Sequence, residues 1–144
     1  MTLPGVLVVD ASVGVKLVIE EEGSEEAEAI FARLGGADPI VLVAPDFFFI
    51  ECANVFRTRV HRRLMTAEQA REAFAILHSL PLQSVASADL VPLALDLALI
   101  HGLSVYDATY AALAERLGVP LVTADGRLAR KLEEAGRKAI LLKG

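Results

Sequence analysis

Short apolar segments alternate with longer segments of helical character along the whole chain. Most of the short segments are unbroken runs of β-branched and aliphatic residues, which is typical of strands buried on both faces. They lie at residues 6–10, 40–44, 81–86, 119–123 and 138–142. Helices are expected at about residues 11–19, 24–34, 46–64, 66–79, 89–101, 104–118 and 127–135. This alternation predicts one α/β domain over residues 1–144, with a mostly parallel sheet that helices cover on both faces.

Polar residues indicate where three of the helices begin. Ser24 is expected to be an N-cap, Thr66 and Gln69 form a capping-box pattern, and Ser104 precedes the helix that ends near Gly118. Helical periodicity predicts a core face on the 46–64 helix made of Phe49, Ala53, Phe56 and Val60. The same periodicity predicts a core face on the 104–118 helix made of Tyr106, Tyr110, Leu113 and Leu117.

The composition excludes several classes of protein. Of 144 residues, 54% are hydrophobic and 23% are charged, so the chain is not disordered. The mean hydropathy is high at +0.49, yet charged residues or proline interrupt every long apolar stretch, so we expect no membrane partner. Cys52 is the only cysteine, which rules out an internal disulfide and is consistent with a reducing, cytoplasmic setting. The net charge of −5 taken alone disfavours a nucleic-acid partner, but acidic blocks (1–54, 86–125) alternate with basic blocks (55–85, 126–144).

Most common catalytic motifs are absent from the sequence. There is no glycine-rich dinucleotide loop, no P-loop and no nucleophile elbow. The three histidines, His61, His78 and His101, share no metal-ligand spacing. Cys52 has no evident base partner, so a buried structural thiol is the better interpretation.

Carboxylates at the ends of elements remain as the candidates for chemistry. Asp10 follows the first strand and Asp125 follows the fourth. If the strand order is 3-2-1-4-5, these two strands are neighbours at the switch point of the sheet, where ligands bind in open α/β folds. The alternative is that each aspartate only caps the helix that follows it.

Two further acids lie on helices. Asp107 lies beside the expected core face of its helix, near alanines that leave space, although the S-x-x-D spacing from Ser104 also suits a local cap. Glu51 falls roughly opposite the expected core face of its helix, so a solvated position is a strong alternative.

Four carboxylates in one crevice would repel one another, and a divalent cation would remove that repulsion. Because no Cys or His cluster is available, the ligands would all be oxygens, which favours Mg²⁺ or Mn²⁺ over zinc. Such an ion binds phosphate and activates water, so phosphodiester hydrolysis is the expected chemistry.

Four segments carry a family resemblance, in this order along the chain: VVDASV, IECANVF, SVYDATYAALAERLG and PLVTADGRL. Together they resemble the PIN-domain family, and specifically its VapC-type toxin ribonucleases. The resemblance implies a PIN-like α/β/α sandwich with the five-stranded order 3-2-1-4-5. It also implies an Mg²⁺- or Mn²⁺-dependent endoribonuclease that cuts single-stranded RNA, a homodimer, and a cognate VapB-type antitoxin.

The resemblance also implies roles for individual residues. The metal-binding and catalytic residues would be Asp10, Glu51, Asp107 and Asp125. Ser12 and Thr123 would support the metal-binding residues or position the substrate, and Asn54 would orient Glu51 or a water molecule.

A basic run follows the second of these segments. Its arginines are candidates for contact with RNA or with an acidic partner, although cations are also stabilised at a helix C-terminus by the dipole. They are Arg57, Arg59, Arg62 and Arg63.

Two other functions remain open on the sequence. One is a non-catalytic PIN-type module that binds RNA or protein. The other is a phosphoryl-receiver-like switch, which also keeps acids beyond its strand ends. A receiver usually has paired acids after the first strand and a lysine after the last, whereas Asp10 stands alone here and Lys143 is the only weak candidate.

Overall fold

The computed structural model describes residues 5–34, 36–37 and 39–142. Its strands form a five-stranded, all-parallel sheet in the order β3-β2-β1-β4-β5. The strands are β1 Val6–Val9, β2 Val41–Pro45, β3 Leu82–Val85, β4 Leu121–Thr123 and β5 Ala139–Leu141. The predicted α/β class and the predicted strand order are therefore confirmed.

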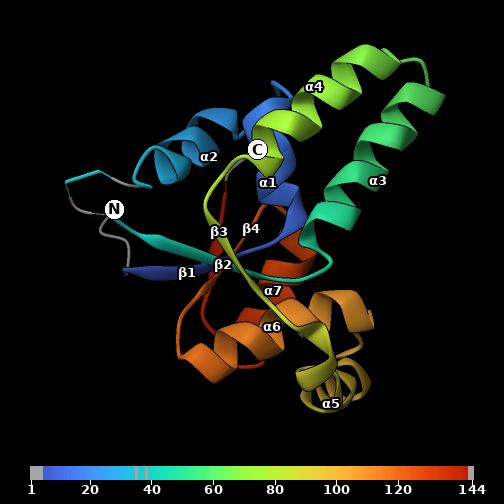
Figure 1. The fold of residues 1–144 in the computed structure, drawn as a ribbon. Coiled ribbons are helices and arrows are strands. Elements are labelled where there is room, and N and C mark those ends of the chain that lie inside the picture. The colour runs from blue at the N-terminus through green and yellow to red at the C-terminus, as the bar shows by residue number, and fades with distance from the viewer. Residues whose placement is uncertain (1–4, 35, 38, 143–144) are drawn as a thin grey trace.

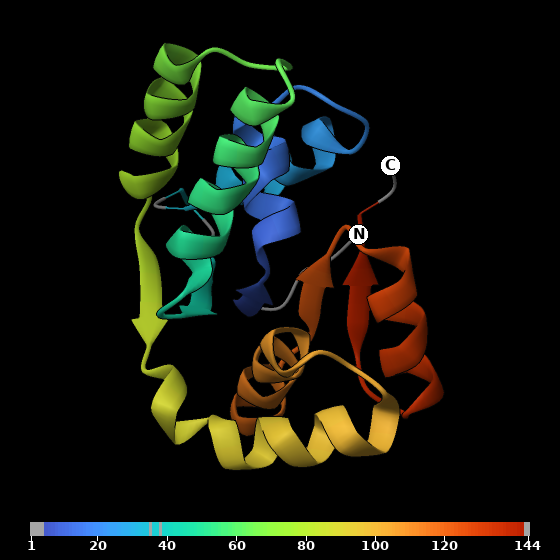
Figure 2. The same ribbon diagram turned by 90° about the vertical axis from the view of Figure 1, so that its right-hand side faces the viewer.

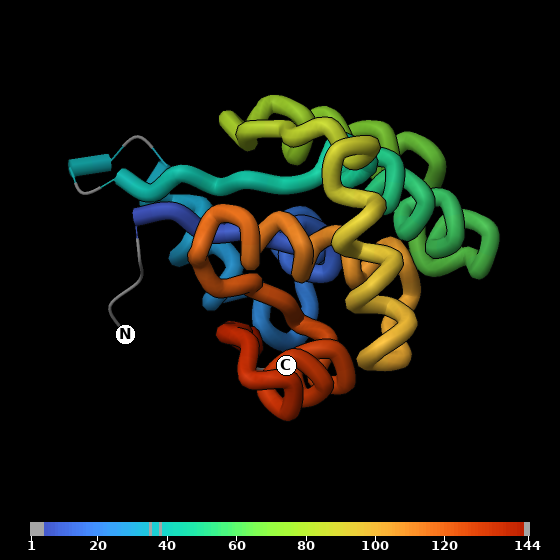
Figure 3. The backbone as a smooth tube through the Cα atoms, turned by 90° about the horizontal axis from the view of Figure 1, so that it is seen from below, coloured from blue at the N-terminus to red at the C-terminus, as the bar shows by residue number. Residues whose placement is uncertain are grey.

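Helices cover both faces of this sheet. The elements that join β1, β2 and β3 are α1 Ala11–Val18, α2 Ser24–Phe31, α3 Phe48–His61 and α4 Ala67–His78. The later elements are a 3₁₀ helix Ser87–Asp89, α5 Val91–His101, α6 Val105–Leu117 and α7 Gly126–Glu134. Figure 1 shows α1 to α4 on one side of the sheet and α5 and α6 on the other. Figure 3 views the molecule from the side of α5 and α6, and Figure 2 shows the strands between the two groups of helices.

The register of the sheet places the ends of two strands side by side. Val9 of β1 pairs with Val122 of β4, so the residues that follow these strands leave the sheet together. Strand order reverses between β1 and β4, because the chain first builds outward through β2 and β3 and then returns to add β4 and β5. The switch point predicted for the site is therefore present in the fold.

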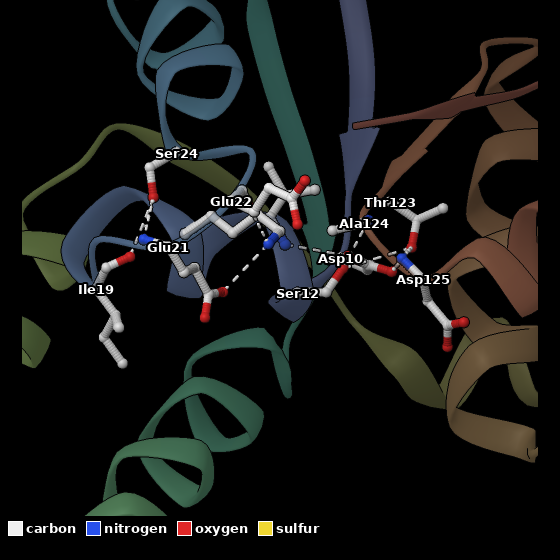
Figure 4. A network of polar contacts seen from close by, with 11 residues as sticks. Asp10, Ser12, Ile19, Glu21, Glu22, Ser24, Thr123, Ala124 and Asp125 are labelled. Atoms are coloured by element: carbon white, nitrogen blue, oxygen red, sulfur yellow. Dashed lines mark hydrogen bonds and ion pairs between the residues drawn. The ribbon is translucent and has the colours of Figure 1, made fainter. Parts of the chain in front are cut away.

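The predicted beginnings of the helices are confirmed in two cases and wrong in one. The Thr66–Gln69 capping box forms at the start of α4, and Ser104 caps α6 through the Asp107 amide. Ser24 is not an N-cap: α2 is preceded by Gly23 at a φ of +91°, and Ser24 is its first helical residue. The Ser24 hydroxyl instead accepts from the Glu21 amide and donates to the Ile19 carbonyl, which closes the turn after α1 (Figure 4). The helix expected over residues 24–34 is shorter in the structure, where α2 ends at Phe31.

The predicted core face of α3 is confirmed at Phe56 and is displaced by one residue at Phe49 and Ala53. Phe48, Cys52 and Phe56 are its buried residues, while Phe49, Ala53 and Val60 are only partly buried. Phe48 and Cys52 approach α1 at Gly14, which has no side chain to hold them away. The expectation that Cys52 is a buried thiol is confirmed.

The predicted core face of α6 is half right. Tyr110 and Leu113 are buried, whereas Tyr106 is 62% exposed and Leu117 is 43% exposed. The central part of the helix packs against β1, β2 and β4 and is buried on every side from Ala108 to Ala114. The first and last turns lie beyond this packed stretch, so apolar residues there reach solvent.

No single helix in the described part of the chain has the length and hydropathy of a membrane span. The helices α5 and α6 pass such a test only when they are taken together across a bend of 115°.

Candidate active site

The four acidic residues that the sequence singled out line one cleft. Asp10 directly follows β1, Asp125 follows β4, Glu51 lies in the first turn of α3 and Asp107 lies in the first turn of α6. Their cleft has a volume of about 280 Å³. The other lining residues are Ala11, Ser12, Asn54, Val55 and Tyr110. The topology of the sheet thus brings together residues that are more than a hundred positions apart.

Asp10 is the most buried of the four acids, with 5% of its surface exposed. Ser12 donates to one carboxylate oxygen, and the Thr123 hydroxyl donates to the other at 2.5 Å (Figure 4). The Val13 amide also donates to Asp10 at 3.3 Å, so Asp10 caps α1 while it faces the cleft. The capping and the functional interpretations of Asp10 are compatible.

Ser12 and Thr123 also tie the two strand ends to each other. The Ala124 amide donates to the Ser12 hydroxyl at 2.9 Å, and the Asp125 amide donates to the Thr123 hydroxyl at 3.0 Å. Each hydroxyl therefore donates to Asp10 and accepts from the loop after β4. This small network joins the two halves of the site across the switch point.

Asp125 uses one carboxylate oxygen as a helix cap. Its Oδ1 accepts from the Arg127 amide at 3.0 Å and from the Leu128 amide at 3.2 Å, which begins α7. The side chain is exposed and lines the cleft.

Glu51 has a partner that the sequence interpretation missed. The Tyr110 hydroxyl of α6 donates to Glu51 Oε1 at 2.7 Å. Tyr110 itself is 1% exposed, and Phe47 packs edge-on against its ring. The signal was available, since a buried tyrosine usually finds a partner for its hydroxyl. Asn54 lines the same cleft but makes no hydrogen bond to Glu51 in the described part of the chain.

The pKa values of three carboxyl groups in the cleft, those of Asp10, Glu51 and Asp107, are raised. Burial raises the pKa of Asp10 to about 6, against the lowering effect of its hydrogen bonds from Ser12 and Thr123. Burial also raises the pKa of Glu51, and the negative charge of Asp107 raises it further. The pKa of Asp107 is raised first by burial and then by the charge of Asp125. Neighbouring negative charges therefore add to the rise in pKa that desolvation causes.

The oxygen donors of the cleft are of the kind that a hard divalent cation prefers. Among the described residues, no three His, Cys, Asp or Glu side chains are gathered closely enough to hold a metal ion as they stand. A magnesium-type site does not need such a cage, because this ion commonly binds one or two carboxylates and keeps several waters. The donors in this cleft are oxygens, and a cation would offset the repulsion between their negative charges.

The arginines of the basic run do not line this cleft. Arg57 and Arg59 lie in the second half of α3, about 9–12 Å from Glu51 along the helix axis at 1.5 Å per residue, and Arg62 and Arg63 follow the end of the helix. Arg57 lines a shallow pocket between α3 and α4, and Arg59 lines another beside the end of α1. Lys143, the weak candidate for a receiver lysine, lies outside the described residues.

Comparison with known proteins supports the resemblance. Residues 7–133 match the sequence profile of the PIN domain. Ribonuclease VapC3 of Pyrobaculum aerophilum is 36% identical over 87% of this chain and 93% of its own length. Ribonuclease VapC12 of Mycobacterium tuberculosis is 34% identical over 86% of this chain and 90% of its own.

Solved structures show the same fold. The crystal structure of Mycobacterium tuberculosis VapC20, a toxin that cleaves the sarcin–ricin loop, has a TM-score of 0.68. It is 21% identical and covers 96% of this chain and 99% of its own. The profile match extends from β1 to α7, across all four segments on which the resemblance rests. By its sequence and its fold, this chain belongs to the PIN-domain family, in the branch of the VapC ribonucleases.

Proposed function

We propose that this protein is a divalent-metal-dependent endoribonuclease that cuts single-stranded RNA and acts as the toxin of a VapBC-type pair. The observation that carries the proposal is the gathering of Asp10, Glu51, Asp107 and Asp125 in one cleft at the switch point of the sheet. The curated relatives are both named as VapC ribonucleases, which supports the same activity.

In this proposal the four carboxylates would hold Mg²⁺ or Mn²⁺, one or two of them directly and the others through bound water. When bound, such an ion supplies an activated water and neutralises charge on the phosphate. Ser12 and Thr123 keep the Asp10 carboxylate in one orientation, and Tyr110 does the same for Glu51. Asn54 lines the same cleft and would position a water molecule or the RNA.

Cleavage of a fluorescent single-stranded RNA tests the activity. Wild-type protein is expected to cut it with Mn²⁺ or Mg²⁺ and to stop when EDTA is in excess. Asp10→Asn removes a central carboxylate charge and is expected to lower kcat by at least a hundredfold. Asp89→Asn is the matched control, because Asp89 is exposed and lies outside the cleft. Tight RNA binding by wild type without cleavage in Mn²⁺ would instead favour a non-catalytic binding module.

Metal binding has a readout that does not depend on activity. A ligand that binds only the folded state stabilises it by about 2.7 kcal/mol at 100 times its Kd. Mn²⁺ is therefore expected to raise the Tm of the wild type by several degrees and to raise that of Asp10→Asn much less. Equal shifts for both proteins would contradict the proposed ligand.

A second copy of this chain is the partner that we propose for α5. This helix is apolar nearly all round, and its outward residues Val91, Leu95, Leu99 and Ile100 are large and exposed. A helix of that kind is normally buried. A twofold dimer would bury the same stripe from both copies.

The antitoxin is proposed to bind the surface at the end of α3. The Arg59 Nε atom is buried there without a hydrogen-bond partner among the described residues, beside a pocket that includes Ile19 and Ile76. An acidic, apolar segment would complement this pocket, and Arg62 and Arg63 follow directly after α3. Titration of the product of a neighbouring small reading frame tests this: Arg59→Ala is expected to weaken binding at least tenfold, and an unchanged affinity would refute it.

A further inference from the structure

A second pocket adjoins the acidic cleft. It has a volume of about 150 Å³ and shares Asp107 and Asp125 with the cleft. Its other walls are the turn between α5 and α6 and the first two turns of α7. Because the two pockets share walls, an extended ligand in the cleft can continue into this second pocket.

The second pocket adds two cations to the two acids that it shares with the cleft. Its cations are Arg127 and Lys131, and both lower the pKa of Asp107. Arg127 is exposed, and its guanidinium has no hydrogen bond or ion pair within the described residues. A free guanidinium beside a carboxylate cluster is a ready ligand for phosphate, because its planar donors match phosphate oxygens in pairs.

Lys131 is held in place by the backbone. Its ammonium donates to the Gly102 carbonyl at 2.7 Å, which links α7 to the turn after α5. Gly102 has a φ of +66°, a conformation that glycine adopts without strain. The ammonium has three donors, so this single bond leaves it able to bind an anion as well.

The helix N-terminus of α7 does not explain the pocket. The Arg127 and Leu128 amides of its first turn are already satisfied by Asp125. An anion in this pocket would therefore be recognised by the two side chains and not by free backbone amides.

We propose that Arg127 and Lys131 bind a phosphate of the RNA adjacent to the one that is cut. This inference rests on the proposed ribonuclease function and specifies how the substrate is held. The four acids of the cleft repel the RNA backbone when no metal is bound, whereas this cationic pair attracts it. Binding of a neighbouring phosphate beside Asp107 and Asp125 sets the position of the scissile phosphate, so the pair are positioning residues.

The dependence of RNA binding on salt tests the proposal without any cleavage. A fluorescein-labelled single-stranded 12-nucleotide RNA is titrated in EDTA at several NaCl concentrations, and the slope of log affinity against log salt is measured. Each phosphate contact on a single strand contributes about 0.7 to that slope. Arg127→Gln is therefore expected to reduce the slope by about 0.7. Arg130→Gln is the matched control, since Arg130 lies exposed on the same helix and lines neither pocket.

Steady-state kinetics with Mn²⁺ give a second readout. Arg127→Gln is expected to raise KM about tenfold, the scale of one lost charge-assisted hydrogen bond, with a smaller effect on kcat. Lys131→Gln is also expected to raise KM and to reduce the salt slope. Lys131→Arg is expected to keep the wild-type salt slope, because it keeps the positive charge.

The outcomes separate this inference from the proposed function. If wild type cuts RNA but Arg127→Gln matches Arg130→Gln in salt slope and KM, the phosphate pocket is refuted and the nuclease stands. If wild type never cuts RNA, the nuclease proposal fails, while the salt slope in EDTA still decides whether Arg127 contacts phosphate. A loss of antitoxin affinity in Arg127→Gln with unchanged RNA binding would also overturn the inference.

Discussion

At the scale of single residues, Asp10 both caps α1 and lines the acidic cleft. It is enclosed by donors from both neighbouring strand ends, and its pKa is still raised to about 6 because burial outweighs those hydrogen bonds. Its raised pKa and its place in the cleft make Asp10 a candidate functional residue, since an uncharged side chain would avoid the desolvation of a carboxylate.

The pKa of Asp10 predicts how the metal-free stability changes with pH. The folded protein retains the Asp10 proton up to about pH 6, whereas the unfolded chain releases it near pH 4. The unfolded state therefore binds fewer protons in this range, and the contribution of Asp10 to stability falls as pH rises, by about 3 kcal/mol in total. Urea unfolding in EDTA from pH 4 to pH 7 measures this fall. Asp10→Asn is expected to flatten the curve, and an unchanged pH dependence would contradict the assignment.

Tyr110 is a second residue whose role can be isolated. Tyr110→Phe keeps the buried ring and removes the hydrogen bond to Glu51, which lowers the pKa of that carboxyl. The variant is expected to lose about 1–2 kcal/mol of stability and to shift the acidic limb of the pH–rate profile to higher pH. Tyr106→Phe is the control, because Tyr106 is exposed and its hydroxyl has no hydrogen bond among the described residues. Equal effects of the two variants would argue against the role of Tyr110.

At the scale of elements, the packing of α1 against α3 determines where Glu51 lies. Phe48 and Cys52 pack at Gly14, and this contact sets the rotation of α3 about its axis. With that rotation Glu51 lies half-buried in the cleft and within reach of Tyr110. Helical periodicity alone placed Glu51 roughly opposite the core face of α3. That expected face included Phe49, whereas the buried residue is Phe48.

Gly14→Ala tests this contact. The added Cβ would lie 2.7 Å from Phe48 Cζ and 3.3 Å from Cys52 Sγ, so α3 or the ring must move. Overpacking of a core usually costs about 1–3 kcal/mol. We expect a loss of that size in urea unfolding and a fall in kcat, because Glu51 moves with α3. Gly5→Ala is the control, since its Cβ would meet nothing within 4 Å. Wild-type stability and kcat in Gly14→Ala would contradict this account.

At the scale of the whole molecule, the distribution of charge and apolar surface explains a composition that looks contradictory. The net charge of −5 includes a cluster of acids that a divalent cation would neutralise, so it does not exclude RNA. The high mean hydropathy includes α5, whose outward face is apolar although it faces solvent in the single chain. Both features are accounted for by the proposed metal and the proposed dimer.

Substitution on α5 tests the dimer. Leu99 is 75% exposed, so Leu99→Lys is expected to leave the fold of the single chain intact. In a dimer the same change would place two unpaired charges in an apolar interface, which is strongly unfavourable. Light scattering after size exclusion is expected to report a dimer for wild type and a monomer for Leu99→Lys. Leu64→Lys changes an equally apolar exposed site away from α5 and is expected to remain dimeric. A monomeric wild type would refute the proposal.

The amino-acid sequence by itself determined the order of the elements, the parallel sheet and the positions of Asp10 and Asp125. These follow from local signals, because buried strands read as apolar runs and capping residues act on their own neighbours. Only the tertiary structure decided that Tyr110 holds Glu51, that Ser12 and Thr123 share Asp10, and that a pocket containing Arg127 and Lys131 adjoins the cleft. The physical reason is that these contacts join residues far apart in the chain. They depend on how the elements pack against one another. Packing determines which residue of a helix faces the sheet, whereas helical periodicity leaves an uncertainty of about one residue.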